Sequence, residues 1–277
     1  VGHAASWTLA GALTARFGWR TAYWVPAAAL LAAAVTWFAV VRDAPDDDGA
    51  GAPARPIVAP TALLGEGLRL VWRGALRWAL AVSVLSGVIK EGVNLWGPTY
   101  LVEEQSLGLF GAALSGLLIP VAGIVGQLVT GYVQRRLERA VHPTQQERPV
   151  VAALGLIVAI GAAGLYAAAS SHSLVVALAM LALVSAGSHA MNGLLMASLP
   201  LSLGPAAPVS AVTGLLNFCQ YLGAGLGAAL VGGLVDRLGW GGAYGWWAGC
   251  ALAIALTAAG ALRRGRLAGP AEGTTGA

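Results

Sequence analysis

Long apolar runs separated by short charged segments extend along the whole chain. Eight stretches lack Asp, Glu, Lys and Arg, apart from one adjacent pair, Lys90 and Glu91. The stretches are 1–15, 21–41, 78–102, 107–134, 149–171, 174–203, 206–235 and 238–262. All but the first reach the ~20 residues that an α-helix needs to cross a bilayer, and they lack the alternation of a β-barrel strand. The pattern predicts an all-α, polytopic membrane protein.

Composition and charge placement support this class. The 277 residues are 57% hydrophobic and 10% charged, with a mean hydropathy of +0.73, whereas soluble domains carry roughly 25% charged residues. If the chain after residue 41 is cytoplasmic, the inner loops hold twelve arginines and the outer loops three. This positive-inside bias predicts a cytoplasmic C-terminus. The net charge of +4 is then explained by topology, and we expect the lipid bilayer, not nucleic acid, as partner.

A segment near the start of the chain recurs near its end. Residues 10–23 read AGALTARFGWRTAY and residues 231–244 read VGGLVDRLGWGGAY, with seven identities at an offset of 221. Each copy is expected to contain a helix end, a tight turn with glycine in it, and the start of the next helix. A parallel repeat of this kind predicts two similar helix bundles related by an axis along the membrane normal.

The repeat also predicts how the chain is divided. Its second copy joins the last two of six helices in 78–262, which we expect to be a C-terminal six-helix bundle. Residues 1–41 are then the end of an N-terminal bundle, its partial fifth helix and its sixth, and further helices are expected before Val1. Residues 42–77 are expected to be a cytoplasmic loop with an amphipathic segment at the interface, and 263–277 a cytoplasmic tail.

Three segments resemble one family of transporters. KEGVNLWGPTYLVEE at 90–104 is similar to the Arg-x-Gly-x-x-x-Trp-x-Pro-Thr-Tyr-Leu pattern of the organophosphate:phosphate antiporters, which belong to the major facilitator superfamily. GWRTAYWVPAAALLAAAVTWFAVVRDAP at 18–45 resembles that family's sixth helix, and VTGLLNFCQYLGAGLGAALVGGLVDRLGWGGAY at 212–244 its eleventh. The resemblance implies the major facilitator fold and the exchange of an organic phosphate ester for inorganic phosphate by alternating access.

Polar residues gather near the middle of three of the predicted helices. They lie within about two turns of a helix midpoint at ~1.5 Å rise per residue, and they are Lys90, Glu91, Asn94, His189, Asn192, Asn217 and Gln220. Binding sites of secondary transporters lie near the bilayer midplane, between the two bundles. The sequence therefore predicts that these residues line a substrate site.

Lys90 is the most informative of them. A charge at a helix centre costs ~2.5–3.5 kcal/mol on insertion scales, so such residues face a cavity or a partner. In the resemblance, Lys90 stands where the family has an arginine that binds the substrate phosphate, which implies a small anionic substrate. Lysine offers a point charge where arginine offers a planar fork. The alternative is a structural ion pair with a carboxylate elsewhere.

Glu91 leaves two interpretations open. Adjacent helix positions do not face each other, so we do not expect Glu91 to neutralise Lys90. It could pair with another helix, or it could carry a coupling proton, as membrane carboxylates do in proton relays. His3 lies deep in the first helix and is similar, with a shorter spacing, to a family histidine, so it is a second candidate for coupling or an ion pair.

Two further groups of side chains could bind the substrate. His189 and Asn192 are three residues apart and share a helix face. Asn217, Gln220 and Tyr221 form a second such face. Either group could hydrogen-bond a phosphoryl or sugar group, and the alternative is hydrogen bonding between helices, worth about 0.6 kcal/mol on average.

The sequence thus predicts a secondary transporter, and an antiporter of phosphate esters is the preferred interpretation. Two alternatives stay open: a proton-coupled symporter of a sugar acid or other carboxylate, and a sugar-phosphate sensor that does not transport. No nucleotide-binding loop, zinc motif or nucleophile elbow occurs in the sequence, so we expect no enzyme, cofactor or metal. Scarce lysine beside abundant arginine, alanine and glycine favours a bacterial inner membrane protein, which we expect to be monomeric.

Overall fold

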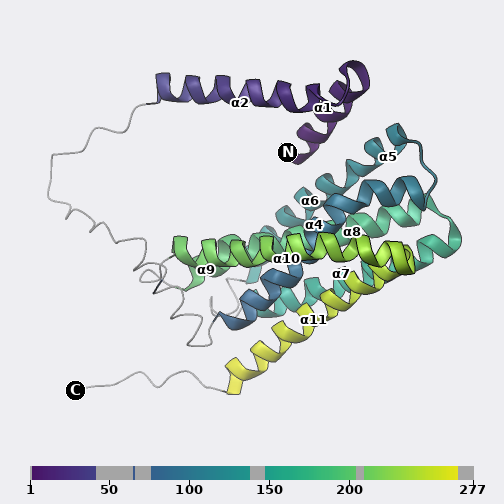
Figure 1. Cartoon of the computed structure of the whole chain (residues 1–277). Coiled ribbons are helices and arrows are strands. Elements are labelled where there is room, and N and C mark those ends of the chain that lie inside the picture. Colours follow the sequence, from purple (N-terminus) through teal and green to yellow (C-terminus); the bar gives the residue numbers. More distant parts are fainter. Residues whose placement is uncertain (1, 42–64, 66–75, 138–146, 204–208, 268–277) are drawn as a thin grey trace, which may run out of the picture. The chain divides into compact units, whose positions relative to one another are not determined.

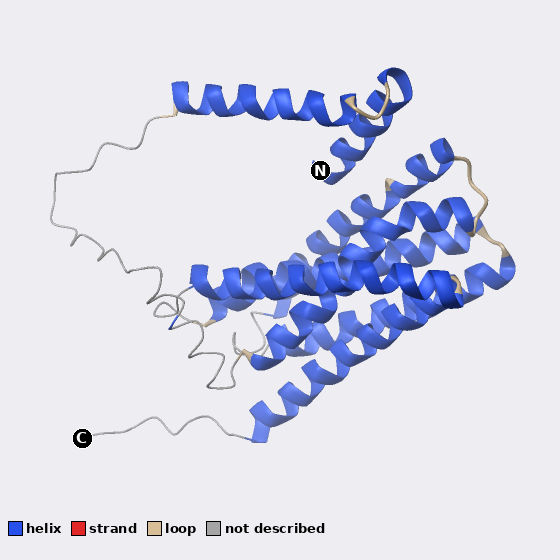
Figure 2. Cartoon of the chain, viewed as in Figure 1, coloured by secondary structure: helices blue, strands red, loops and turns tan. Residues whose placement is uncertain are grey.

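The computed structural model describes residues 2–41, 65, 76–137, 147–203 and 209–267 (Figure 1). The predicted amphipathic segment within 42–77 and most of the predicted tail lie outside these ranges, apart from a few residues. The regular elements in the described part are all helices (Figure 2). Among the described residues, seven helical segments are long and apolar enough to cross a membrane. The predicted all-α, polytopic class is therefore confirmed.

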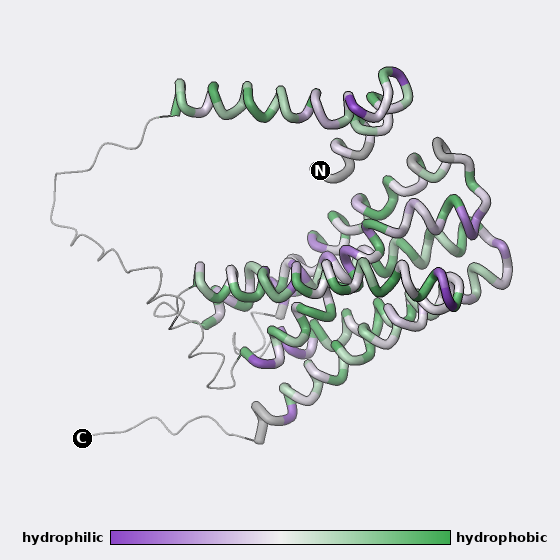
Figure 3. Tube along the Cα trace, in the orientation of Figure 1, coloured by the Kyte–Doolittle hydropathy of each residue, from purple (hydrophilic) through white to green (hydrophobic). Residues whose placement is uncertain are grey.

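The chain divides into two units, Val1–Pro60 and Thr61–Ala277. In the first unit, helix α1 spans Gly2–Phe17 and helix α2 spans Thr21–Val40. The second unit contains α4 (Arg77–Glu103), α5 (Leu109–Gly116), α6 (Leu118–Leu137), α7 (Glu147–Ser171), α8 (Leu174–Gly193), the π-helix η2 (Leu194–Ser198), α9 (Leu199–Ser202), α10 (Val209–Leu238) and α11 (Trp240–Leu267). Its six membrane-length segments coincide closely with the six charge-poor stretches after residue 78. The hydrophilic colour in Figure 3 gathers mostly towards helix ends.

The sequence repeat corresponds to two turns with the same backbone geometry. Gly18 between α1 and α2 has a φ of 86°, and Gly239 between α10 and α11 has a φ of 66°. A side chain is disfavoured in this left-handed region, so glycine suits both turns. The aromatic residues that follow the second of these turns are buried. Trp240 and Tyr244 are 5% and 1% exposed because they pack edge-on against Tyr100 of α4, at ring-centroid distances of 5.4 and 5.7 Å.

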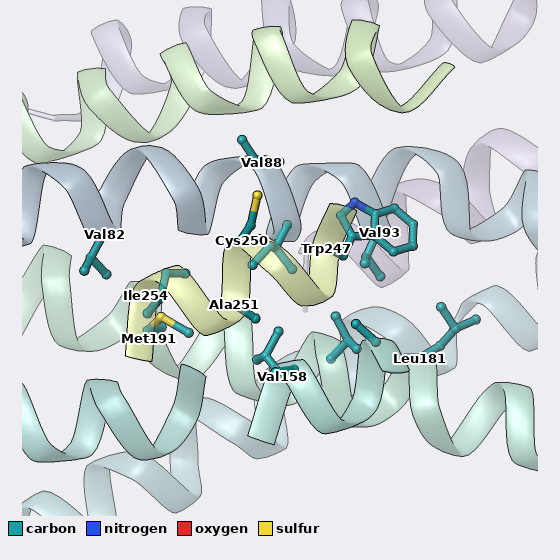
Figure 4. Packing of buried hydrophobic residues seen from close by; sticks show 14 of the residues in the cluster. Val82, Val88, Val93, Val158, Leu181, Met191, Trp247, Cys250, Ala251 and Ile254 are labelled. Carbon is teal, nitrogen blue, oxygen red and sulfur yellow. The ribbon is translucent and has the colours of Figure 1, made fainter. Parts of the chain in front are cut away.

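The core of the second unit lies where α4, α7, α8 and α11 meet. Its buried apolar residues include Val82, Val88, Val93, Val158, Leu181, Met191, Ala251 and Ile254. Trp247 of α11 is 1% exposed and lies beside Val93 of α4 (Figure 4). A Cβ placed on Gly92 would stand 2.8 Å from the Trp247 Nε1, so the glycine makes room for the indole ring.

Helices α4 and α10 approach each other through glycine. A Cβ on Gly223 would overlap the carbonyl oxygen of Val84, and one on Gly87 would overlap that of Gln220. A Cβ on Gly227 would stand 2.9 Å from the Cα of Val88. Small residues let membrane helices pack backbone to backbone.

A proline accounts for the irregular part of the span that begins with α8. Pro200 has no backbone N–H and would clash with the carbonyl of Met196 in a regular helix. The helix widens into η2 just before it, where the N–H of Leu199 bonds to the carbonyl of Leu194. The hydroxyl of Thr213 on α10 donates to the freed carbonyl of Met196 at 3.5 Å.

Candidate functional site

A polar stripe runs along one face of α4. Ser83, Ser86, Lys90 and Asn94 follow one another at spacings of three, four and four residues, so they share one face of a helix. Lys90 is the central residue of α4, about 20 Å from either end at ~1.5 Å per residue. The two serines are fully buried and Asn94 is 9% exposed. The stripe therefore places a lysine at mid-depth among buried polar groups.

The same face of α4 carries two glycines that contact neighbouring helices. Gly87 packs against the backbone of Gln220 on α10, and a Cβ on Gly97 would meet the side chain of Ile119 on α6. The stripe is thus bordered by α10 on one side and α6 on the other. Pro98 lies within α4 and cannot donate to the carbonyl of Asn94, so a backbone acceptor is freed at the same level.

Lys90 and Glu91 form an ion pair, with 3.0 Å between the Lys90 Nζ and the Glu91 Oε1. The expectation that Glu91 does not neutralise Lys90 is therefore wrong. Their Cβ atoms point about 100° apart around the helix, since there are 3.6 residues per turn. Both side chains are long and flexible enough to bend towards each other. The lysine side chain is the more buried partner, at 12% exposed against 27%.

His189 lies at the seam between α8 and α6, and Asn192 is three residues further along α8. The ring of His189 lies against Gly123 of α6, where a Cβ would stand 2.8 Å from it. Its Nδ1 is 3.0 Å from the carbonyl oxygen of Ser185 and 3.3 Å from the hydroxyl oxygen of the same residue. The Ser185 hydroxyl also donates to the carbonyl of Ile119 on α6 at 2.6 Å. These hydrogen-bond contacts of His189 are within its own helix, and it is Ser185 that makes the hydrogen bond between α8 and α6.

The three residues predicted on α10 occupy different environments. Gln220 is 2% exposed and lies at the α4 interface. Asn217 is exposed, and Tyr221 is 61% exposed. The structure therefore places only Gln220 next to the polar face of α4. His3 is in α1, which belongs to the other unit.

The sequence matches the family model of the major facilitator superfamily over residues 1–228. This range is most of the 277-residue chain. The chain belongs to the major facilitator superfamily. No curated protein matches it. Members of this superfamily are secondary transporters that act on small substrates in a lipid bilayer, and they are not enzymes.

In this superfamily member, several buried polar atoms of the described residues, some of them on the stripe, have no hydrogen-bond partner. They are the Ser83 and Ser86 hydroxyls, the Asn94 Nδ2, the Asn192 Oδ1, the Gln220 Nε2, the Tyr244 hydroxyl and the Trp247 Nε1. An unsatisfied buried group costs about 1–3 kcal/mol, so such groups mark places where a ligand or water binds. Asn94, Asn192 and Gln220, all predicted from the sequence, are among them.

Ser83, Ser86 and Trp247 were not among the residues that the sequence predicted. The serines could have been found, because their three- and four-residue spacing to Lys90 puts them on its face. Serine is common in membrane helices, however, so the spacing alone has little weight. Trp247 carries no such signal, since only the packing of α11 on α4 turns its indole N–H towards Gly92.

Proposed function

We propose that the chain is part of an antiporter that exchanges an organic phosphate ester for inorganic phosphate. The observation that carries this proposal is Lys90, a largely buried cation at the centre of a membrane-spanning helix, on the same face as an amide without a hydrogen-bond partner. Intramembrane ionisable residues line substrate pathways or relays as a rule. The resemblance around residues 90–104 favours a phosphate ester as the substrate class.

The groups near Lys90 match an anion. The lysine ammonium has three donors, and Glu91 occupies one direction. The Nδ2 of Asn94, one turn along the same face, and the Nε2 of Gln220 on the adjoining helix are buried donors without an acceptor. A phosphoryl group presents several acceptor oxygens to such donors, and charge-assisted hydrogen bonds are roughly twice as strong as neutral ones. His189, Asn192, Asn217 and Tyr221 are proposed as further substrate contacts on the sequence pattern alone.

The proposed mechanism is alternating access about this midplane site. Two bundles related by the internal repeat would rock about the anion, which is the general behaviour of transporters with such repeats. The exchange of one phosphate species for another returns the site to the same charge after each half-cycle. We also propose that the C-terminus is cytoplasmic, on the arginine distribution given above.

The test is phosphate exchange by the full-length protein in phosphate-loaded liposomes. Efflux of phosphate is expected when glycerol 3-phosphate or a hexose phosphate is added outside. Lys90→Ala should lower the rate at least tenfold, whereas Lys90→Arg should retain exchange because it keeps the cation. Leu95→Ala, at a position of α4 that is 59% exposed, is the matched control and should exchange like the wild type.

Two other outcomes would replace the proposal. Uptake that is driven by a pH gradient, without release of phosphate, would indicate a proton-coupled symporter of a sugar acid or another carboxylate. Saturable binding of a sugar phosphate with no flux would indicate a sensor. Exchange that is equally fast in Lys90→Ala would remove Lys90 from the substrate site.

A further inference from the structure

The ion pair of Lys90 and Glu91 must change when a substrate anion binds to Lys90. The Glu91 Oε1 lies 3.0 Å from the Lys90 Nζ, which is the position that a substrate oxygen would take. An anion on the remaining donors of the ammonium lies within a few ångströms of the Glu91 carboxylate, and the two like charges repel each other. The anion therefore competes with Glu91 for Lys90. This argument rests on the proposed function, in which Lys90 binds the anion.

The surroundings of Glu91 decide what becomes of the displaced carboxylate. Three of the four residues that lie three or four positions from it on α4 are apolar: Gly87, Val88 and Leu95. The fourth, Asn94, is polar and neutral. No cation other than Lys90 is thus available on that face of the helix. A carboxylate that loses the cation it is paired with, in apolar surroundings, binds a proton more readily.

The helices packed against α4 are α5, α6, α8, α10 and α11. In the part of the chain that the structure describes, their charged residues lie in or near terminal turns: Arg135, Arg136, Asp236, Arg237, Arg263, Arg264 and Arg266. Their titratable groups nearer mid-depth are His189 of α8, Cys219 and Tyr221 of α10, and Cys250 of α11. His189 is hydrogen-bonded to Ser185 on its own helix, and the others are two thiols and a phenol, which are not cationic side chains.

We propose that Glu91 is a proton-binding site linked to anion binding at Lys90. In the empty site, Glu91 is ionised and paired with Lys90. When the substrate oxygen displaces the carboxylate, Glu91 takes a proton from the aqueous phase, and its O–H bond replaces the ionic contact. The empty site carries one positive and one negative charge. With a monoanion bound and Glu91 protonated, the site again carries one of each. With a dianion bound, the proton on Glu91 lowers the added negative charge from two units to one.

Because proton binding and anion binding are linked in this proposal, it predicts how the Kd of the anion changes with pH. If anion binding requires a proton at Glu91, the apparent Kd should rise with pH, by up to about tenfold per pH unit. Glu91→Gln cannot ionise and cannot neutralise Lys90. That variant should therefore bind the anion more tightly than the wild type at alkaline pH, and its Kd should not change with pH.

The experiment uses the full-length protein in detergent and glycerol 3-phosphate as the probe, between pH 7.0 and 8.5. This range lies above the second phosphate pKa of about 6, so the charge of the probe is nearly constant. Binding is titrated directly, and proton uptake is followed with a pH dye in weak buffer. The wild type should take up as much as one proton per anion bound, and Glu91→Gln none. Glu104→Gln, the same substitution at the outer end of α4, should behave like the wild type.

The outcomes separate the two proposals. Binding of the probe that is lost in Lys90→Ala but occurs without proton uptake in the wild type overturns the role of Glu91 alone. Proton uptake that persists unchanged in Glu91→Gln does the same. Absence of binding by the wild type, or binding that survives Lys90→Ala, overturns the proposed function and this inference with it. If Glu91→Gln fails to fold, the proton uptake of the wild type is by itself the test.

Discussion

Substitution of Gly223 by alanine tests the close approach of α10 to α4. A Cβ at this position would overlap the carbonyl oxygen of Val84, which is backbone and cannot rotate away. Ordinary contact begins near 3.4 Å, and a Cβ on Gly227, one turn further along, would stand only 2.9 Å from the Cα of Val88. Relieving a contact like that at Gly227 would need the helices to separate by about 0.5 Å, and the overlap at Gly223 is more severe, so a larger separation is needed. A gap of ~0.5–1 Å forfeits a quarter to a half of the dispersion attraction between the helices.

A matched control isolates this effect. Gly225 is on the same helix and a Cβ there would meet nothing within 4 Å. Both alanine substitutions gain the helix propensity of alanine, up to ~1 kcal/mol, so the difference between them reports the overpacking at Gly223. Overpacking costs about 1–3 kcal/mol. At ~2–4 °C per kcal/mol for a chain of this size, a loss near the middle of that range lowers the Tm by about 4–8 °C.

The assay is thermal unfolding in detergent, followed by the fluorescence of the ten tryptophans. Gly223→Ala should unfold at least several degrees below Gly225→Ala, which should match or exceed the wild type. Equal Tm values for the two variants would refute the reasoning, because they would mean that α10 does not rest on the backbone of α4.

The same assay checks three other contacts. Trp240→Phe removes the N–H that donates to the Glu103 carboxylate at 3.1 Å and should cost about 1.5–3 kcal/mol, as expected for a bond to a charged group; an unchanged Tm would contradict this. Arg148→Gln removes the guanidinium that donates to the Ala261 carbonyl at 2.9 Å, so we expect a loss of about 1–3 kcal/mol, with Arg148→Lys intermediate. Ser185→Ala removes the hydroxyl that donates to a buried carbonyl of α6 and should cost about 0.5–1.5 kcal/mol, the usual net contribution of one hydrogen bond, whereas Ser185→Thr, which keeps the hydroxyl, should lose less.

Much of the fold follows from the sequence alone. Only helices satisfy their own backbone in lipid, so each long charge-free stretch had to be a helix, and the spans of the structure coincide with those stretches. The repeat predicted the two glycine turns at Gly18 and Gly239, since a glycine with positive φ is a local property of the backbone. The mid-helix position of Lys90 was likewise readable, because it depends only on the distance along α4 to either end.

Tertiary structure decided which polar residues share an environment. Hydropathy distinguishes lipid-soluble segments from charged ones but does not say which face of a helix meets which neighbour. Gln220 is buried because Gly87 lets α10 come close to α4, while Asn217 and Tyr221 on the same helix stay exposed. His189 turns to α6 because Gly123 leaves space for its ring. The Lys90–Glu91 ion pair was not expected, because adjacent Cβ atoms point to different sides of a helix. The length of the two side chains, and not their spacing in the sequence, determines whether the charges meet.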